Sequence, residues 1–172
     1  MKYQLVIRTL AVATALTLCV ASGFAQMKPV KKKTVELKDA KGNDVGTATI
    51  VSKGPGVEVK LALKGLPPGE HAVHFHQNAK CDPPDFKSAG PHFSPTGHMH
   101  DSAPAGDIPD FSLIVGKDGT AHVSTVAPNV TLGDDDHSVF SNGGTAIVIH
   151  AVAGGTGSGA PPRIACGVIS KP

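Results

Sequence analysis

The chain has 172 residues, with 16 Lys and Arg against 14 Asp and Glu and a formal net charge of +2. This near-balance argues against a nucleic-acid-binding protein, which needs a dense basic face, and a single Tyr with no Trp leaves few rings for base stacking. The length suits one domain, and 20 Gly and 14 Pro placed between β-branched runs favour short strands joined by turns.

Residues 1–25 are predicted to be a secretory signal peptide. Lys2 and Arg8 give a positive start, and the apolar run 10–21 is too short for a membrane anchor. Small residues follow at positions suited to cleavage. We therefore expect a mature chain that begins near Gln26, lacks a transmembrane segment and is exported to the periplasm or the extracellular space.

Residues 26–33 (QMKPVKKK) are predicted to be a short basic tail. Such a tail is typical of a solvated, frayed terminus, and the alternative is electrostatic contact with an anionic envelope surface. The folded domain is expected over residues 34–172.

About eight strands are predicted in this domain from the alternation of apolar and polar residues and from the turns between them. Residues 78–109 are rich in Pro and lack periodicity, so they are expected to form a long loop, which in a compact domain is usually functional. A sandwich or flattened barrel of antiparallel strands follows from this pattern. The expected strands are residues 34–37, 45–51, 57–63, 71–77, 111–115, 121–126, 145–152 and 163–169.

The histidines are the unusual feature of the composition, with nine in the chain. In a strand, alternate residues point to one face, so His74 and His76 would lean the same way while Phe75 enters the opposite side. His92 follows in the loop, and His150 lies on an apolar strand where an unpaired ring is costly. Four imidazoles without a nearby thiolate favour a borderline metal ion, with Cu(II) the best match.

Five segments carry a resemblance to a known family. In the same order along the chain, they are similar to motifs of the copper-zinc superoxide dismutases, especially the bacterial exported branch. The resemblance covers Gly65 to Ile169. The segments are GLPPGEHAVHFH at 65–76, CDPPDFKSAGPHFSP at 81–95, GDIP at 106–109, AIVIH at 146–150 and RIACGVI at 163–169.

The resemblance implies an all-β fold, an eight-stranded antiparallel Greek-key flattened barrel with a long metal-binding loop. It also implies that His74, His76, His92 and His150 bind copper, with one copper ion per chain. By the same resemblance, His92 would also move a proton in catalysis, and Arg163 would meet the anion beside the copper. The alternative for Arg163 is a surface salt bridge.

Two cysteines remain once the signal peptide, with Cys19, is removed. An even pair in an oxidising compartment predicts one disulfide between Cys81 and Cys166, and the alternative is two free buried thiols. The resemblance agrees, because both residues occupy the positions of the family's intrasubunit disulfide.

The family's zinc site is incomplete in this sequence. His92, His100 and Asp107 match three of its ligands, but Pro104 stands where the fourth is expected. His98 could replace it, so that zinc would be held by His92, His98, His100 and Asp107. The family's aspartate that links the ligands of the two metals is here Gly154, and the loop after it is short. These losses resemble the copper-only branch, while a rebuilt zinc site and a metal-poor relative are the alternatives.

The expected reaction is the disproportionation of superoxide to dioxygen and hydrogen peroxide. An exported copper-binding or copper-buffering protein on the same fold is the main alternative, and a purely structural adhesion or pilus-type sandwich is a weaker one. His71 and His137 match family positions that do not bind metal, and His122 is expected to face solvent. The oligomeric state does not follow from the sequence.

Overall fold

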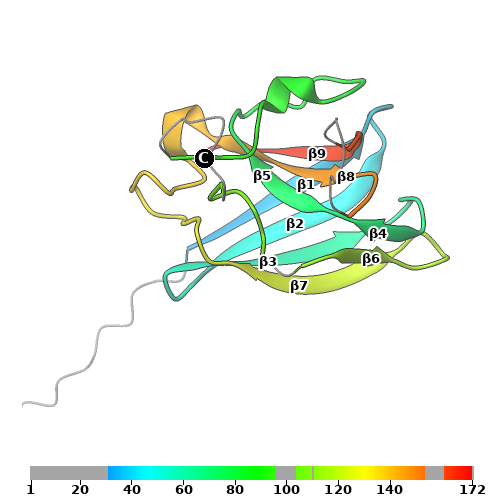
Figure 1. The fold of residues 1–172 in the computed structure, drawn as a ribbon, viewed down its shortest axis with the longest axis horizontal. Coiled ribbons are helices and arrows are strands. Elements are labelled where there is room, and N and C mark those ends of the chain that lie inside the picture. Colours follow the sequence, from blue (N-terminus) through cyan, green and yellow to red (C-terminus); the bar gives the residue numbers. More distant parts are fainter. Residues whose placement is uncertain (1–30, 96–103, 110, 154–160, 172) are drawn as a thin grey trace, which may run out of the picture.

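The computed structural model describes residues 31–95, 104–109, 111–153 and 161–171 (Figure 1). The predicted signal peptide and most of the basic tail lie outside these residues. So do His98, His100 and Gly154, on which the expectations about zinc partly depend.

As predicted from the sequence, the described residues form an antiparallel all-β fold, which also contains two short 3-10 helices. The strands are β1 (Lys32–Asp39), β2 (Asp44–Lys53), β3 (Gly56–Leu63), β4 (Gly69–His71), β5 (Val73–His76), β6 (Leu113–Val115), β7 (Ala121–Ala127), β8 (Thr145–His150) and β9 (Arg163–Ile169). The 3-10 helices are η1 (Lys87–Ala89) and η2 (Ser141–Gly143).

Seven strands form one curled sheet in the order β5-β8-β9-β1-β2-β3-β7, and β4 pairs with β6 in a second, smaller sheet. The two sheets are connected at both edges of the larger one, because β4 runs into β5 and β6 runs into β7 (Figure 1). Apolar side chains of both layers meet between them and form the main core. The arrangement is the predicted flattened barrel.

One predicted strand differs from the structure in a way that matters for the site. The run expected at 71–77 is interrupted at Ala72, so that β4 belongs to the small sheet and β5 to the large one. The backbone of Ala72 still bonds on both sides, to the N–H of His150 and to the carbonyl of Val152. The interruption therefore attaches the start of β5 to the end of β8, where His150 lies.

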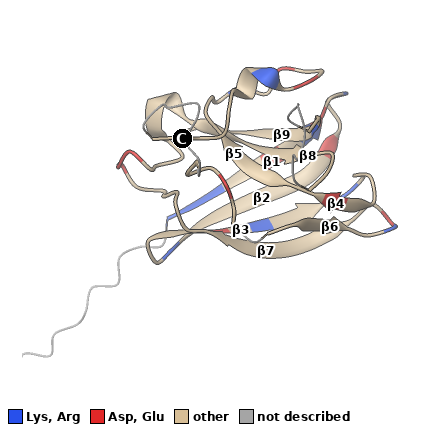
Figure 2. Ribbon diagram, in the orientation of Figure 1, with Lys and Arg blue, Asp and Glu red and all other residues tan. Residues whose placement is uncertain are grey.

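Charges of both signs are scattered over the strands and loops (Figure 2). In the described part of the chain, no helix is both long and apolar enough to cross a membrane.

Candidate metal centre

Side chains alternate along β5 between the inner face of the sheet, where the core lies, and the outer face, where the site lies. Phe75 points into the barrel and is 0% exposed, within the main core. His74 and His76 therefore point to the outer face of the sheet, as predicted. They pair in register with Val148 and Ala146 of β8, whose side chains lie on that same outer face with a second apolar cluster.

His150 ends β8 on the same outer face. The register of β8 with β9 shifts between Ile149 and His150, so that His150 pairs with Arg163. Such a bulge re-aims a side chain at the end of a strand. His150 is 1% exposed and lies against His76, with their Nε2 atoms 3.2 Å apart.

His92 comes from the long loop, which folds back onto β5. The loop forms an isolated bridge between His76 and His92, and the N–H of Phe93 donates to the carbonyl of Phe75 at 2.8 Å. Phe93 is fully buried in the core. The apolar side chain that follows the histidine thus anchors the loop and holds His92 over the sheet.

The four histidines form one cluster. Each offers a ring nitrogen, and these four atoms all lie within 4.8 Å of one another. The centroids of the His74 and His92 rings are 4.1 Å apart. Among the described residues, this cluster is the group of three or more His, Cys, Asp or Glu side chains that could hold a metal ion.

Hydrogen bonds set the direction of two of the rings. Nδ1 of His76 donates to the Gly90 carbonyl at 2.9 Å, and Nδ1 of His150 donates to the Pro161 carbonyl at 3.1 Å. A carbonyl oxygen only accepts, so each Nδ1 carries the hydrogen and each neutral ring keeps a lone pair on Nε2. Two lone pairs then face each other across 3.2 Å, an arrangement that a cation between them would stabilise.

His74 supplies the observation that tests whether these residues fit a metal. Its Nδ1 is buried and has no hydrogen-bond partner. A buried polar atom without a partner costs roughly 1–3 kcal/mol, and a bound cation removes that cost. Because the site offers imidazole nitrogens alone, the donor set fits Cu(II).

The surroundings keep these rings neutral. Burial, with smaller effects from His92 and His150, lowers the pKa of His74 to about 3. Burial also lowers the pKa of His76 to about 2, against the opposing effect of the bond to Gly90. Burial likewise lowers the pKa of His150. A neutral imidazole is the form that binds metal, so near neutral pH all three rings are ready to do so.

Asp107 is in contact with the His92 ring. Its Oδ1 accepts from Nδ1 of His92 at 2.6 Å. Gly106 makes this approach possible, because a Cβ at that position would collide with the Phe75 carbonyl. The backbone of Gly106 instead bonds to both Phe75 and Phe93, so the segment with Asp107 lies directly against β5.

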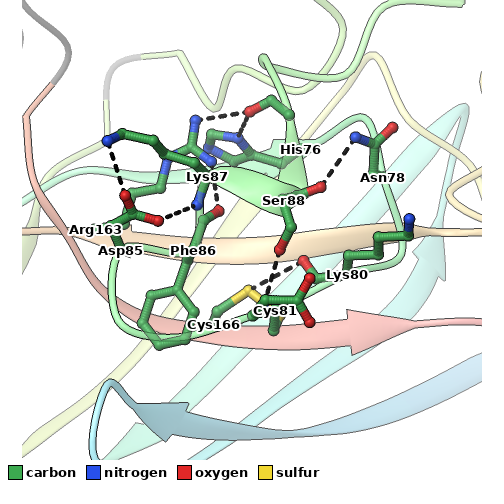
Figure 3. Close-up of a disulfide and its surroundings, with 12 residues drawn as sticks. His76, Asn78, Lys80, Cys81, Asp85, Phe86, Lys87, Ser88, Arg163 and Cys166 are labelled. Carbon is green, nitrogen blue, oxygen red and sulfur yellow. Dashed lines mark hydrogen bonds and ion pairs between the residues drawn. A yellow bond between two sulfur atoms is a disulfide. The ribbon is translucent and has the colours of Figure 1, made fainter.

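Arg163 begins β9 beside the cluster and is held by the long loop (Figure 3). Its Nη1 donates to the Phe86 carbonyl and its Nη2 to the Gly90 carbonyl, both at 2.7 Å. Phe86 has a left-handed backbone (φ 53°), which is rare for a bulky residue, and its ring is buried under the loop. The Gly90 carbonyl also accepts from His76, so one oxygen connects the arginine with the histidine cluster.

The predicted disulfide is present between Cys81 and Cys166, with Cα atoms 5.7 Å apart. It joins the long loop to β9, three residues after Arg163 in the sequence. The loop carbonyls that hold the guanidinium are thereby tied to the strand that carries it.

The remaining described histidines are not members of the metal-binding cluster. Both ring nitrogens of the buried His71 bond to carbonyls, those of His150 and Pro67. His137 bonds to the carbonyl of Asn129, and His122 is exposed on β7. These positions agree with the structural and solvent-facing interpretations made from the sequence.

The backbone carbonyls that hold Arg163 were not predicted from the sequence. The carbonyls of Phe86 and Gly90 carry no signal of their own, since any residue has one. The left-handed conformation of Phe86 also has no marker in the sequence. The glycine at position 90 is a usable signal in the sequence. Its φ is 78°, which favours glycine, and a Cβ there would press on the Asn78 side chain.

Comparisons with known proteins agree with this geometry. The family model described as copper/zinc superoxide dismutase (SODC) matches residues 44–169. A copper-zinc superoxide dismutase of Aquifex aeolicus is 39% identical over 153 residues, covering 80% of this chain and 86% of that protein. That of Caulobacter vibrioides is 36% identical over 176 residues, covering 93% and 98%. The crystal structure of a SOD-like protein from Bacillus subtilis is 31% identical, with a TM-score of 0.69 over 78% of this chain and 96% of that one.

Proposed function

Because the chain belongs to the copper/zinc superoxide dismutase family, we propose that it disproportionates superoxide at one copper ion, without a complete zinc site. The convergence of four imidazoles around the unpartnered Nδ1 of His74 carries this proposal. The residues that would hold the copper are His74, His76, His92 and His150. When bound there, copper would supply the redox chemistry by alternating between Cu(II) and Cu(I): one superoxide is oxidised to dioxygen, and a second is reduced and takes up two protons to leave as hydrogen peroxide.

His92 is the ring best placed to move a proton. Its side chain is 31% exposed, whereas His76 and His150 are almost fully buried. Water can therefore reach His92 more easily than His76 and His150. We assign His92 Nε2 the uptake of a proton in one half of the cycle and its return to the peroxide in the other. Asp107 would keep the ring oriented through Nδ1.

Arg163 would bind and orient the superoxide anion. Its guanidinium is always charged at neutral pH, and the two carbonyls that hold it carry no net charge. Besides burial and His92, its charge contributes to the lowered pKa of His150, so its field reaches the cluster. A fixed positive group beside the reacting centre attracts the anion without having to reorganise first.

The residues around Asp107 support a copper-only site. Asp107 Oδ1 is hydrogen-bonded to His92 Nδ1 at 2.6 Å, a contact that can orient the His92 ring without a second metal. Pro104 offers no side-chain ligand, and its carbonyl accepts from the N–H of Asp107 to close the turn.

We further propose that the chain works outside the cytosol as one domain after loss of residues 1–25. Because β1 begins at Lys32, the last two residues of the expected basic tail belong to this domain. The Cys81–Cys166 disulfide supports export, because such bonds persist in oxidising compartments. N-terminal sequencing of the exported protein tests the cleavage near Gln26. A first residue well upstream of Gln26 would contradict it.

The direct test of the activity is superoxide decay with copper-loaded protein, compared with the Arg163→Met variant. A dismutase should be far faster than the metal-free protein, and Arg163→Met should lose much of that rate while keeping its copper. If the loaded protein binds copper tightly and shows no turnover, the copper-buffering alternative is correct.

A further inference from the structure

The positive charge of Arg163 is not neutralised by the long-loop groups that hold its side chain. Both of its terminal nitrogens bond to neutral carbonyls of residues 86 and 90 (Figure 3). The guanidinium therefore keeps a full positive charge at the edge of the histidine cluster. Any carboxylate nearby would weaken its attraction for an anion.

Asp85 is such a carboxylate. It directly precedes Phe86, whose carbonyl holds Arg163. Burial lowers the pKa of Arg163, and the negative charge of Asp85 raises it. The two charges thus act on each other, although among the described ion pairs Asp85 is joined to Lys87 and not to Arg163.

Lys87 occupies both oxygens of Asp85. Its Nζ lies 2.8 Å from Oδ2, and its backbone N–H donates to Oδ1 at 3.1 Å. These bonds lower the pKa of Asp85, so the carboxylate stays ionised. The Lys87 side chain is 82% exposed, so it can be substituted without disturbing the core.

We propose that Lys87 preserves the anion attraction of Arg163 by neutralising Asp85. With Lys87 present, the three side chains carry a net charge of +1; without it they carry none. Lys87 is a positioning residue for the anion site, because it acts through Asp85 and does not touch the substrate. This inference rests on the proposed function, which makes a small anion the molecule that enters the site.

The test uses azide as the anion probe on the copper-loaded full-length protein, followed by the copper absorption spectrum. We expect Lys87→Met to weaken azide binding about two- to threefold at low salt, and Asp85→Asn to strengthen it about as much. The double variant regains the net charge of +1 and should bind azide nearly as the wild type does. At 1 M salt, where charges are screened beyond about 3 Å, the differences should vanish.

Lys171 and Asp134 provide the matched control. They form a comparable exposed ion pair, with Lys171 Nζ 2.9 Å from Asp134 Oδ1, just beyond the opposite end of β9 from Arg163. Lys171→Met and Asp134→Asn change the net charge of the protein equally but should leave azide affinity unchanged. Lys87→Arg should retain wild-type affinity.

The inference is overturned if Lys87→Met and Lys171→Met have the same effect, or if Asp85→Asn fails to rescue Lys87→Met. Its failure can be distinguished from a failure of the proposed function. If azide affinities follow the expected order and the wild type shows no dismutation, only the enzymatic function is wrong. If the wild type is active and the affinities do not change, only the role of Lys87 is wrong.

Discussion

The two sides of the histidine cluster are built in different ways. On the barrel side, His74, His76 and His150 stand on paired strands, and His76 and His150 are almost fully buried. On the loop side, His92 and Asp107 lie on irregular segments and hold each other through one hydrogen bond. Hydrogen bonds between strands fix the first side. The second side depends on the close packing of Gly106 against Phe75 and on the turn closed between Pro104 and Asp107.

This difference would explain how the proposed copper site can persist beside an incomplete zinc site. Strand-borne ligands are placed by the same alternation that fills the core, so they cannot move unless the barrel changes. A loop-borne position can exchange a ligand for Pro104 without disturbing β5 or β8. Copper binding should therefore tolerate changes of loop residues that are not copper ligands, such as Asp107, better than changes of the rings on the strands.

Removal of a strand-borne ring should have the largest effect. We expect His150→Ala to lose copper affinity by more than about 100-fold, because a direct ligand matters more than the groups that orient it, and to lose essentially all dismutation. Copper content after dialysis and superoxide decay measure this. His122→Ala, an exposed histidine on β7, is the control; equal losses in both variants would contradict the site assignment.

The disulfide should dominate the stability of the loop side. It closes a loop across a sequence separation of 85 residues, which corresponds to roughly 4–5 kcal/mol in the chain-entropy model. The Cys81→Ala, Cys166→Ala double variant should unfold at a markedly lower urea concentration and bind anions more weakly, since the carbonyls around Arg163 lose their anchor. Unchanged stability would show that packing alone holds the loop.

Lowering the pH should destabilise the metal-free protein, because the neutral rings of His74 and His76 resist protonation in the folded state. Between about pH 6.5 and pH 3, unfolded histidines bind protons that folded His74 and His76 do not, because their pKa values are lowered to about 3 and about 2. The free energy of unfolding of the metal-free protein should therefore fall as the pH falls through this range, by up to about 1.4 kcal/mol per pH unit for each ring. Urea unfolding at several pH values measures the slope. His76→Gln should make it shallower, and an identical slope would contradict the account.

A substitution on the loop side should have the smallest effect on copper affinity. Asp107→Asn keeps the size of the side chain and removes the charge that orients His92, so copper affinity should fall by about tenfold. Competition with a copper chelator measures it. A loss as large as that of His150→Ala would mean that the two sides are not independent.

The strand-borne part of the site could be predicted from the sequence, and the loop-borne part only in outline. The alternation around Phe75 is enough to predict that His74 and His76 share one face, because alternation is a property of any strand. The bond between His92 and Asp107 depends on how Gly106 packs, and the clamp on Arg163 depends on backbone carbonyls. Neither feature produces a periodic pattern in the sequence from which it could be predicted. The break at Ala72 was missed because the residues on both sides of it have strand character.

The central claim is tested most directly by metal analysis of the copper-loaded protein before and after incubation with zinc, together with its rate of superoxide decay. We predict one copper per chain, no retained zinc and an unchanged rate, with His98→Ala as active as the wild type. Stoichiometric zinc that depends on His98 and His100 and that raises the rate would contradict a copper-only site, while leaving the assignment of the dismutase reaction intact.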